Sequence, residues 1–150
     1  MHHAAIRTAD IHRAIAFYQQ LGFELEVRYT TGITLACWLV GLGSRLELIE
    51  IPHPKPAPDA FGDERYVGYY HLSFDLSATT DSLTAWLEAL RARLDSAAAC
   101  DPDRLAPLQV LLAPTTQAIG NGRYEVAFIA DSDGLPLEFL RRQDAPNGEA

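Results

Sequence analysis

The sequence predicts an α+β fold made of two βαβββ modules, each with a strand, a helix and three further strands. Two observations lead to this prediction. The same order of strand, helix and turn patterns runs through both halves of the 150-residue chain, and a His and a Glu recur at corresponding places in that order. A single domain would then comprise a first module at 1–51, a proline-rich linker at 52–67, a second module at 68–141 and a flexible tail at 142–150.

The first module opens with a short strand at 3–8. Asp10 follows and can cap a helix, because its carboxylate accepts hydrogen bonds from the exposed amides of the first turn. Apolar residues at helical spacing run to Gly22, and a glycine commonly ends a helix in the left-handed conformation. Short turns then separate three predicted strands, at 23–29, 33–40 and 45–51.

Alternating prolines interrupt the chain after the first module. They are Pro52, Pro54, Pro56 and Pro58. Proline removes backbone donors and is excluded from helix interiors and central strands, so this segment is a linker. The second module restarts with a strand at 69–76 and a helix that residues 79–81 can cap. The Asn121-Gly122 pair predicts a hairpin, and the remaining strands are expected at 108–113, 124–130 and 135–140.

Charge and composition narrow the possible partners. The formal net charge is −8, which argues against nucleic acid and anionic membranes because both require a basic face. No apolar run approaches the length of a membrane span, and the N-terminus lacks the pattern of a signal peptide. Two cysteines, Cys37 and Cys100, are typical of a reducing compartment. We therefore expect a cytoplasmic protein.

Each half carries a His at the start of its first strand and a Glu within its last strand. The pairs are His3 with Glu47 and His71 with Glu138. Large apolar residues flank each Glu, so each carboxylate points to the opposite face of its strand from those neighbours. A buried carboxylate without a partner is costly, so each Glu either faces solvent or is held by a cation.

For any one of these residues taken alone, a solvated strand face or an ordinary core or surface histidine is the more common explanation. Glu50, on the opposite face from Glu47, is interpreted in that way as solvated. Recurrence of the His and Glu arrangement in both halves weakens this explanation for the other four residues.

Two imidazoles and two carboxylates form a suitable ligand set for one divalent metal ion. They leave room for one or two water or substrate oxygens, and the absence of thiolates excludes a cysteine-rich structural zinc site. Ni, Co, Mn, Fe and Zn all suit this set, and the sequence does not choose among them. The metal ligands predicted are His3, Glu47, His71 and Glu138.

Five segments occur in an order and spacing that is specific for one known family. They are His3-Ala-Ala-Ile-Arg7-Thr-Ala-Asp10, Ala16-Phe17-Tyr18-Gln-Gln-Leu-Gly22-Phe23, Leu46-Glu47-Leu48, His71-Leu-Ser-Phe-Asp75 and Asp131-Ser-Asp133-Gly134-Leu-Pro-Leu137-Glu138-Phe139. In these segments the chain resembles the vicinal oxygen chelate superfamily of glyoxalases, bleomycin-resistance proteins and dioxygenases. The resemblance implies paired βαβββ modules around a concave mixed-sheet cavity, and it implies the same four metal ligands.

Within that superfamily the pattern is most similar to the lactoylglutathione lyase (glyoxalase I) branch. The ring-cleaving dioxygenases leave the position of Glu47 without a ligand, whereas here it is filled. The resemblance implies that the metal acts as a Lewis acid, that Glu138 is the catalytic base and that Glu47 is the second catalytic carboxylate. It also implies that glutathione can be part of the substrate, with Arg7 contacting its carboxylate. An exposed strand charge is the alternative explanation for Arg7.

The sequence leaves several alternative functions open. Ile51 and Val67 stand where the lactoylglutathione lyase branch has polar or basic contacts to glutathione, although Arg65 lies close to Val67 in sequence. Arg123 either supplies a positive charge or simply flanks the predicted hairpin. The alternatives are a metal-free small-molecule binding or sequestering protein of the bleomycin-resistance type, a dioxygenase, and a thiol transferase of the fosfomycin-resistance type, against which the acidic charge argues. The resemblance further implies a homodimer, in which the two ligand pairs of a site come from one chain or from two.

Overall fold

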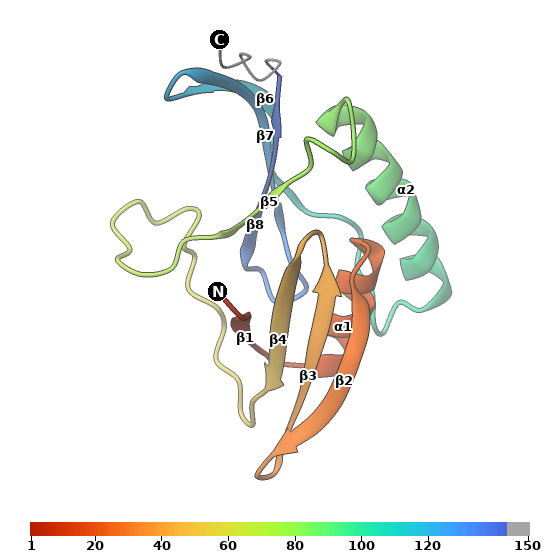
Figure 1. Cartoon of the computed structure of the whole chain (residues 1–150). Coiled ribbons are helices and arrows are strands. Elements are labelled where there is room, and N and C mark those ends of the chain that lie inside the picture. Colours follow the sequence, from red (N-terminus) through yellow and green to blue (C-terminus); the bar gives the residue numbers. More distant parts are fainter. Residues whose placement is uncertain (144–150) are drawn as a thin grey trace.

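The computed structural model describes residues 1–143 of the chain. Within them the order of elements is β-α-β-β-β, twice over, so the predicted α+β fold of two βαβββ modules is confirmed. Figure 1 shows the elements, which are β1 (Ala4–Thr8), α1 (Ile11–Gln20), β2 (Glu24–Thr31), β3 (Thr34–Gly41), β4 (Ser44–Glu50), β5 (Leu72–Asp75), α2 (Leu83–Cys100), β6 (Val110–Ile119), β7 (Gly122–Ala130) and β8 (Pro136–Arg142).

Each module forms its own four-stranded mixed sheet. The strand order is β1-β4-β3-β2 in the N-terminal sheet and β5-β8-β7-β6 in the C-terminal sheet. The first and last strands of each module are parallel neighbours, with Ala5 opposite Glu47 and Ser73 opposite Glu138. This pairing places the residue before β1 or β5 near the start of β4 or β8, within reach of Glu47 or Glu138.

The helices cover one face of the sheets and define the core. Figure 1 shows α1 behind the N-terminal sheet and α2 alongside the C-terminal sheet, and the two helices also contact each other. The apolar neighbours of each Glu lie in this core. They are Leu46, Leu48, Leu137 and Phe139, all at most 1% exposed. Because side chains alternate along a strand, burying these four turns Glu47 and Glu138 to the face away from the helices.

Helix termini are set partly as predicted. Asp10 caps α1 by accepting from the backbone N–H groups of His12 and Arg13, at 2.9 Å each. Gly22 has φ +93°, the left-handed conformation expected after the helix. The second cap was expected at residues 79–81, which is wrong: α2 is capped by Ser82, whose hydroxyl accepts from Ala85 N. Ser82 has the extended backbone of an N-cap, with φ −153°.

Glu50 is not the solvated residue that the sequence suggested. Its Oε2 accepts from Ile11 N at 3.0 Å, at the first residue of α1. Glu125 does the same for α2, with Leu83 N at 3.0 Å. A carboxylate is favourable at a helix N-terminus, where unpaired N–H groups carry partial positive charge. In each module a strand carboxylate on the helix side therefore anchors the start of the helix.

Several boundaries differ from the prediction. The strand that follows His71 begins at Leu72 rather than at residue 69. β6 continues past Pro114 to Ile119, because the register shift between Leu112 and Thr115 accommodates a residue that cannot donate to the ladder. The hairpin predicted at Asn121-Gly122 joins β6 to β7. β8 extends to Arg142, and residues 144–150 of the predicted tail lie outside the described residues.

A polar cluster locks the two modules together. Asp133, in the turn before β8, accepts from Thr8 Oγ1 at 2.5 Å and from Arg13 Nη2 at 2.8 Å. Asp131, in the same turn, accepts from the hydroxyl of the fully buried Tyr18 at 2.9 Å. Charge-assisted hydrogen bonds of this kind are the stronger ones in proteins, so the turn before β8 holds the modules in one relative orientation.

No helix within residues 1–143 is long and apolar enough to cross a membrane.

Replacing Asp133 by Ala should destabilise the fold. The change removes the bonds from Thr8 and Arg13 and leaves Arg13 Nη2 without this acceptor, which typically costs about 1–3 kcal/mol in the free energy of unfolding. Urea denaturation at pH 7 measures this. The exposed turn residue Asp103 gives a matched control, since Asp103→Ala should stay within about 0.5 kcal/mol of wild type. Equal stability of both variants would contradict the role of the cluster.

The pH dependence of stability should report on Asp131. Burial raises the pKa of this carboxyl from its ordinary value of 3.8, although backbone N–H bonds from Leu135 and Asp133 partly oppose the shift. A group with a raised folded pKa favours folding while it is protonated, and this contribution is lost as the pH rises through the folded pKa. Asp131→Asn cannot ionise, so its stability relative to wild type should increase as the pH rises above 3.8. Urea titrations at several pH values would contradict this if the difference stayed constant.

Candidate metal centre

The structure brings each predicted His and Glu together within its own module. His3 Nε2 lies 3.3 Å from Glu47 Oε2, and His71 Nε2 lies 3.2 Å from Glu138 Oε2. The Glu side chains are 16% and 14% exposed, respectively. Each His directly precedes the first strand of its module, and the parallel pairing of first and last strands brings it to the Glu.

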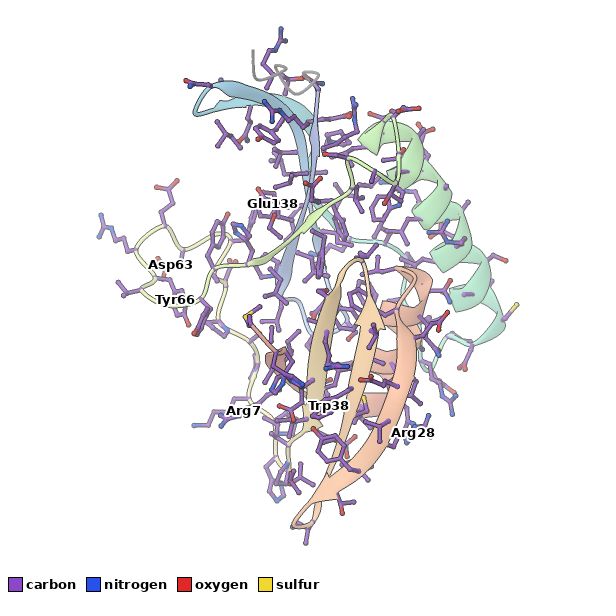
Figure 2. All side chains as sticks on the ribbon, viewed as in Figure 1. Arg7, Arg28, Trp38, Asp63, Tyr66 and Glu138 are labelled. Carbon is purple, nitrogen blue, oxygen red and sulfur yellow. The ribbon has the colours of Figure 1, made fainter. Side chains whose placement is uncertain are left out.

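The two pairs do not meet within one chain. Among residues 1–143, no group of three or more His, Cys, Asp or Glu side chains is placed to hold a metal ion. Trp38 is the cross-strand neighbour of Glu47 and marks its position in the N-terminal sheet. Figure 2 shows Trp38 well apart from Glu138, which lies in the C-terminal sheet. The described part of one chain therefore presents two separate His–Glu pairs, which we call half-sites.

The half-site around Glu47 contains two polar residues that the sequence reasoning missed. Tyr29 Oη donates a short hydrogen bond to Glu47 Oε1, and Trp38 Nε1 donates to the same oxygen at 3.4 Å. Desolvation, followed by the hydrogen bond to Glu47, raises the pKa of Tyr29 to about 12, so its hydroxyl is a proton donor at neutral pH. The alternation of side chains along a strand could have indicated that Trp38 and Glu47 share a face. That inference requires the register of β3 against β4, which the sequence does not give.

Trp38 is at the centre of a cluster of rings and charges. Its ring lies edge-on to Tyr29 at 5.8 Å between centroids and 5.9 Å from the His3 ring. The Arg45 guanidinium carbon is 5.4 Å from the Trp38 ring centroid, and Arg45 also pairs with Glu26 at 2.7 Å. A cation over an indole face is attractive, so this arrangement fixes the ring.

The half-site around Glu138 is apolar by contrast. Phe128 stands directly opposite Glu138 in the β7–β8 pairing and lies edge-on to the His71 ring at 5.0 Å. Tyr70 and Phe61 pack on Phe128, at 6.0 Å and 5.3 Å between centroids. His71 Nδ1 is buried and has no hydrogen-bond partner within the described part of the chain.

Arg7 lies where the sequence placed it but makes no contact with the pair. It is two residues beyond Ala5, the neighbour of Glu47, and therefore shares the face of that carboxylate. The side chain is exposed, and Figure 2 shows it extending away from the sheet. The structure is consistent with either a substrate contact or a solvated charge.

The donor set fits a divalent metal ion. In each half-site an imidazole nitrogen lies within 3.3 Å of a carboxylate oxygen, and all four donors are types that Ni, Co, Mn, Fe and Zn accept. The His and the Glu of each pair also lie within ion-pairing distance of each other.

Comparison with known proteins identifies the family. The family model of the Glyoxalase/Bleomycin resistance protein/Dioxygenase superfamily matches residues 1–139. The chain belongs to this superfamily, which confirms the resemblance seen in its motifs. A comparison with curated proteins found no match.

Solved structures show the same fold at low identity. A glyoxalase family protein from Enterococcus faecalis is 20% identical with a TM-score of 0.63, over 94% of this chain and 96% of that one. A glyoxylase/bleomycin resistance protein/dioxygenase domain from Frankia is 22% identical with a TM-score of 0.62, over 95% and 97%. A glyoxalase I mutant from Zea mays is 20% identical with a TM-score of 0.62, over 97% of this chain but 46% of the longer one.

Proposed function

We propose that this protein is a divalent-metal-dependent lyase or isomerase of the glyoxalase type, acting on a substrate with two adjacent oxygens such as a 2-oxo-aldehyde adduct. The observation that carries the proposal is the pair of half-sites, each with an imidazole nitrogen within 3.3 Å of a carboxylate oxygen. Membership of the superfamily and the similarity to glyoxalase I from Zea mays support it.

The residues that would hold the metal are His3, Glu47, His71 and Glu138. When bound, the ion supplies Lewis-acid polarisation of a carbonyl or enediolate oxygen. Glu138 removes a proton from the carbon beside the carbonyl and returns it to the neighbouring carbon, so the reaction is an isomerisation with no net gain or loss of atoms.

Recognition of the substrate is proposed to involve Arg7, which can pair with a carboxylate of an anionic substrate such as a glutathione adduct. Ile51 and Val67 offer no polar contact at the places where glutathione recognition was expected. The substrate is therefore proposed only as a vicinal dioxygen compound with an anionic group. Both cysteines are free thiols, which suits the cytoplasmic location expected for such an enzyme.

A homodimer would complete the site. One chain presents two half-sites that do not meet, and the ligand-bearing sheet faces turn away from the helices. The His3–Glu47 pair of one copy could then face the His71–Glu138 pair of a second copy, and two equivalent sites would form about a two-fold axis. Under this proposal, the ligands of each metal site come from two chains.

A metal-free binding protein is the second candidate. The observation that favours it is that each His already pairs with its Glu, so neither carboxylate needs a cation to be satisfied. Such a protein would use the same faces to sequester a small molecule, as the bleomycin-resistance members of the superfamily do. Dioxygenase or thiol-transferase chemistry would use the same fold but has no separate observation in its favour.

Elemental analysis of the purified, chelator-free protein separates these candidates. We expect about one Ni, Co, Mn, Fe or Zn ion per chain, held in a dimer, and its loss in Glu47→Ala and in His71→Ala because each variant removes one ligand of four. Sedimentation analysis of the same samples checks the dimer. No metal in the wild type, and no uptake on titration, would rule out the metalloenzyme and leave the binding protein.

Glu138→Gln tests the catalytic base. The amide keeps the shape and a coordinating oxygen but cannot take a proton, so turnover of a 2-oxo-aldehyde adduct should fall about 100- to 10,000-fold while most of the metal is retained. Steady-state assays on metal-loaded protein measure this. Exposed Glu88 on α2 supplies the matched control, since Glu88→Gln should turn over as wild type does. Normal turnover by Glu138→Gln would show that the base is misplaced.

A further inference from the structure

The two carboxylates of the candidate site are held differently. Glu47 has three neighbours that bond to it: Tyr29 and Trp38 donate to Oε1, and His3 approaches Oε2. Glu138 has only His71, which approaches its Oε2 at 3.2 Å, and no other residue from 1–143 donates to it. The difference is not one of exposure, because both side chains are similarly buried.

The internal repeat makes this a matched comparison. In the N-terminal sheet the residue opposite the carboxylate is Trp38, which carries an N–H donor. At the equivalent place in the C-terminal sheet it is Phe128, which carries none. Equivalent backbone positions therefore present a hydrogen-bond donor to one Glu and a hydrocarbon ring to the other.

The donors to Glu47 are themselves fixed. Tyr29 lies on β2 and Trp38 on β3, so residues from two strands of one sheet donate hydrogen bonds to the same oxygen, Glu47 Oε1. The two rings contact each other edge-on, and Arg45 lies over Trp38. With Oε1 occupied, Glu47 presents Oε2 in a single orientation, and rotating its side chain away would break the bonds from the part-buried Tyr29 hydroxyl and Trp38 indole N–H.

Glu138 is free of this restraint. Its Oε1 accepts no hydrogen bond from the described residues, and the flanking ring of Phe128 does not bond to a carboxylate. Rotation of the Glu138 side chain therefore breaks only the contact to His71.

We propose that Tyr29 and Trp38 are positioning residues that hold Glu47 in one orientation as a metal ligand, a support that the C-terminal half-site lacks. This inference rests on the proposed function. It holds whether the other ligand pair comes from the same chain or from a second copy, because Tyr29, Trp38 and Glu47 share one sheet. Residues that orient a metal ligand typically contribute about 10- to 100-fold to metal affinity.

Titration of the full-length protein with Co²⁺, followed by absorption spectroscopy, tests the inference. Tyr29→Phe and Trp38→Phe should each weaken Co²⁺ binding about 10-fold or more, because each removes one donor while keeping an aromatic ring. Tyr124→Phe is the matched control. It removes a hydroxyl that has no partner among residues 1–143 and should bind Co²⁺ as wild type does. Urea denaturation of the metal-free variants checks that they are folded, and Tyr29→Phe alone suffices if Trp38→Phe does not fold.

A second comparison tests the asymmetry itself. Glu47→Gln should weaken Co²⁺ binding at least about 10-fold more than Glu138→Gln, since only Glu47 is a held ligand. Co²⁺ binding by wild type that is unchanged in Tyr29→Phe and Trp38→Phe would overturn this inference and leave the proposed function standing. Equal losses in the two Glu→Gln variants would overturn it as well. No Co²⁺ uptake by wild type would contradict the proposed function, and this inference with it.

Discussion

The parallel pairing of the first and last strands of each module is the constraint on which the rest of the structure depends. It sets Ala5 beside Glu47 and Ser73 beside Glu138, so a His one residue before the strand reaches a Glu that is more than forty positions away in sequence. The buried leucines and phenylalanine on either side of each Glu then decide which face the carboxylate takes. A one-residue slip in either pairing would turn the carboxylate into the core, where an unpaired charge is costly.

The two half-sites are chemically unequal, although the modules that carry them repeat the same topology. The N-terminal half is polar, with Tyr29 and Trp38 bonded to Glu47, whereas the C-terminal half surrounds Glu138 with rings. The helix-side carboxylates show the opposite behaviour, because Glu50 and Glu125 bond equivalently to the starts of the two helices. The two modules therefore have equivalent contacts at the starts of their helices and different contacts around Glu47 and Glu138.

Much of this architecture could be predicted from the sequence, because it follows from local rules. Alternation around Glu47 and Glu138, the Asp10 cap and the Asn121-Gly122 hairpin are all short-range signals. Contacts between distant residues could not be predicted in the same way. Glu50 was expected to be solvated, and this prediction was wrong. Its hydrogen-bond donor, the N–H of Ile11, is 39 residues earlier in the chain, and the sequence alone does not show that the two residues meet.

The Ser82 cap was missed because three neighbouring residues were equally good candidates, and Tyr29 and Trp38 were missed because strand register is not visible in a single sequence.

The central claim is that one metal ion joins the two half-sites. X-ray absorption spectroscopy of the Co²⁺-loaded protein tests it most directly, because scattering from imidazole rings counts the histidine ligands. We predict two imidazoles per ion, with oxygen donors completing the shell. A single imidazole per ion, which is what each half-site binding alone would give, would contradict the account.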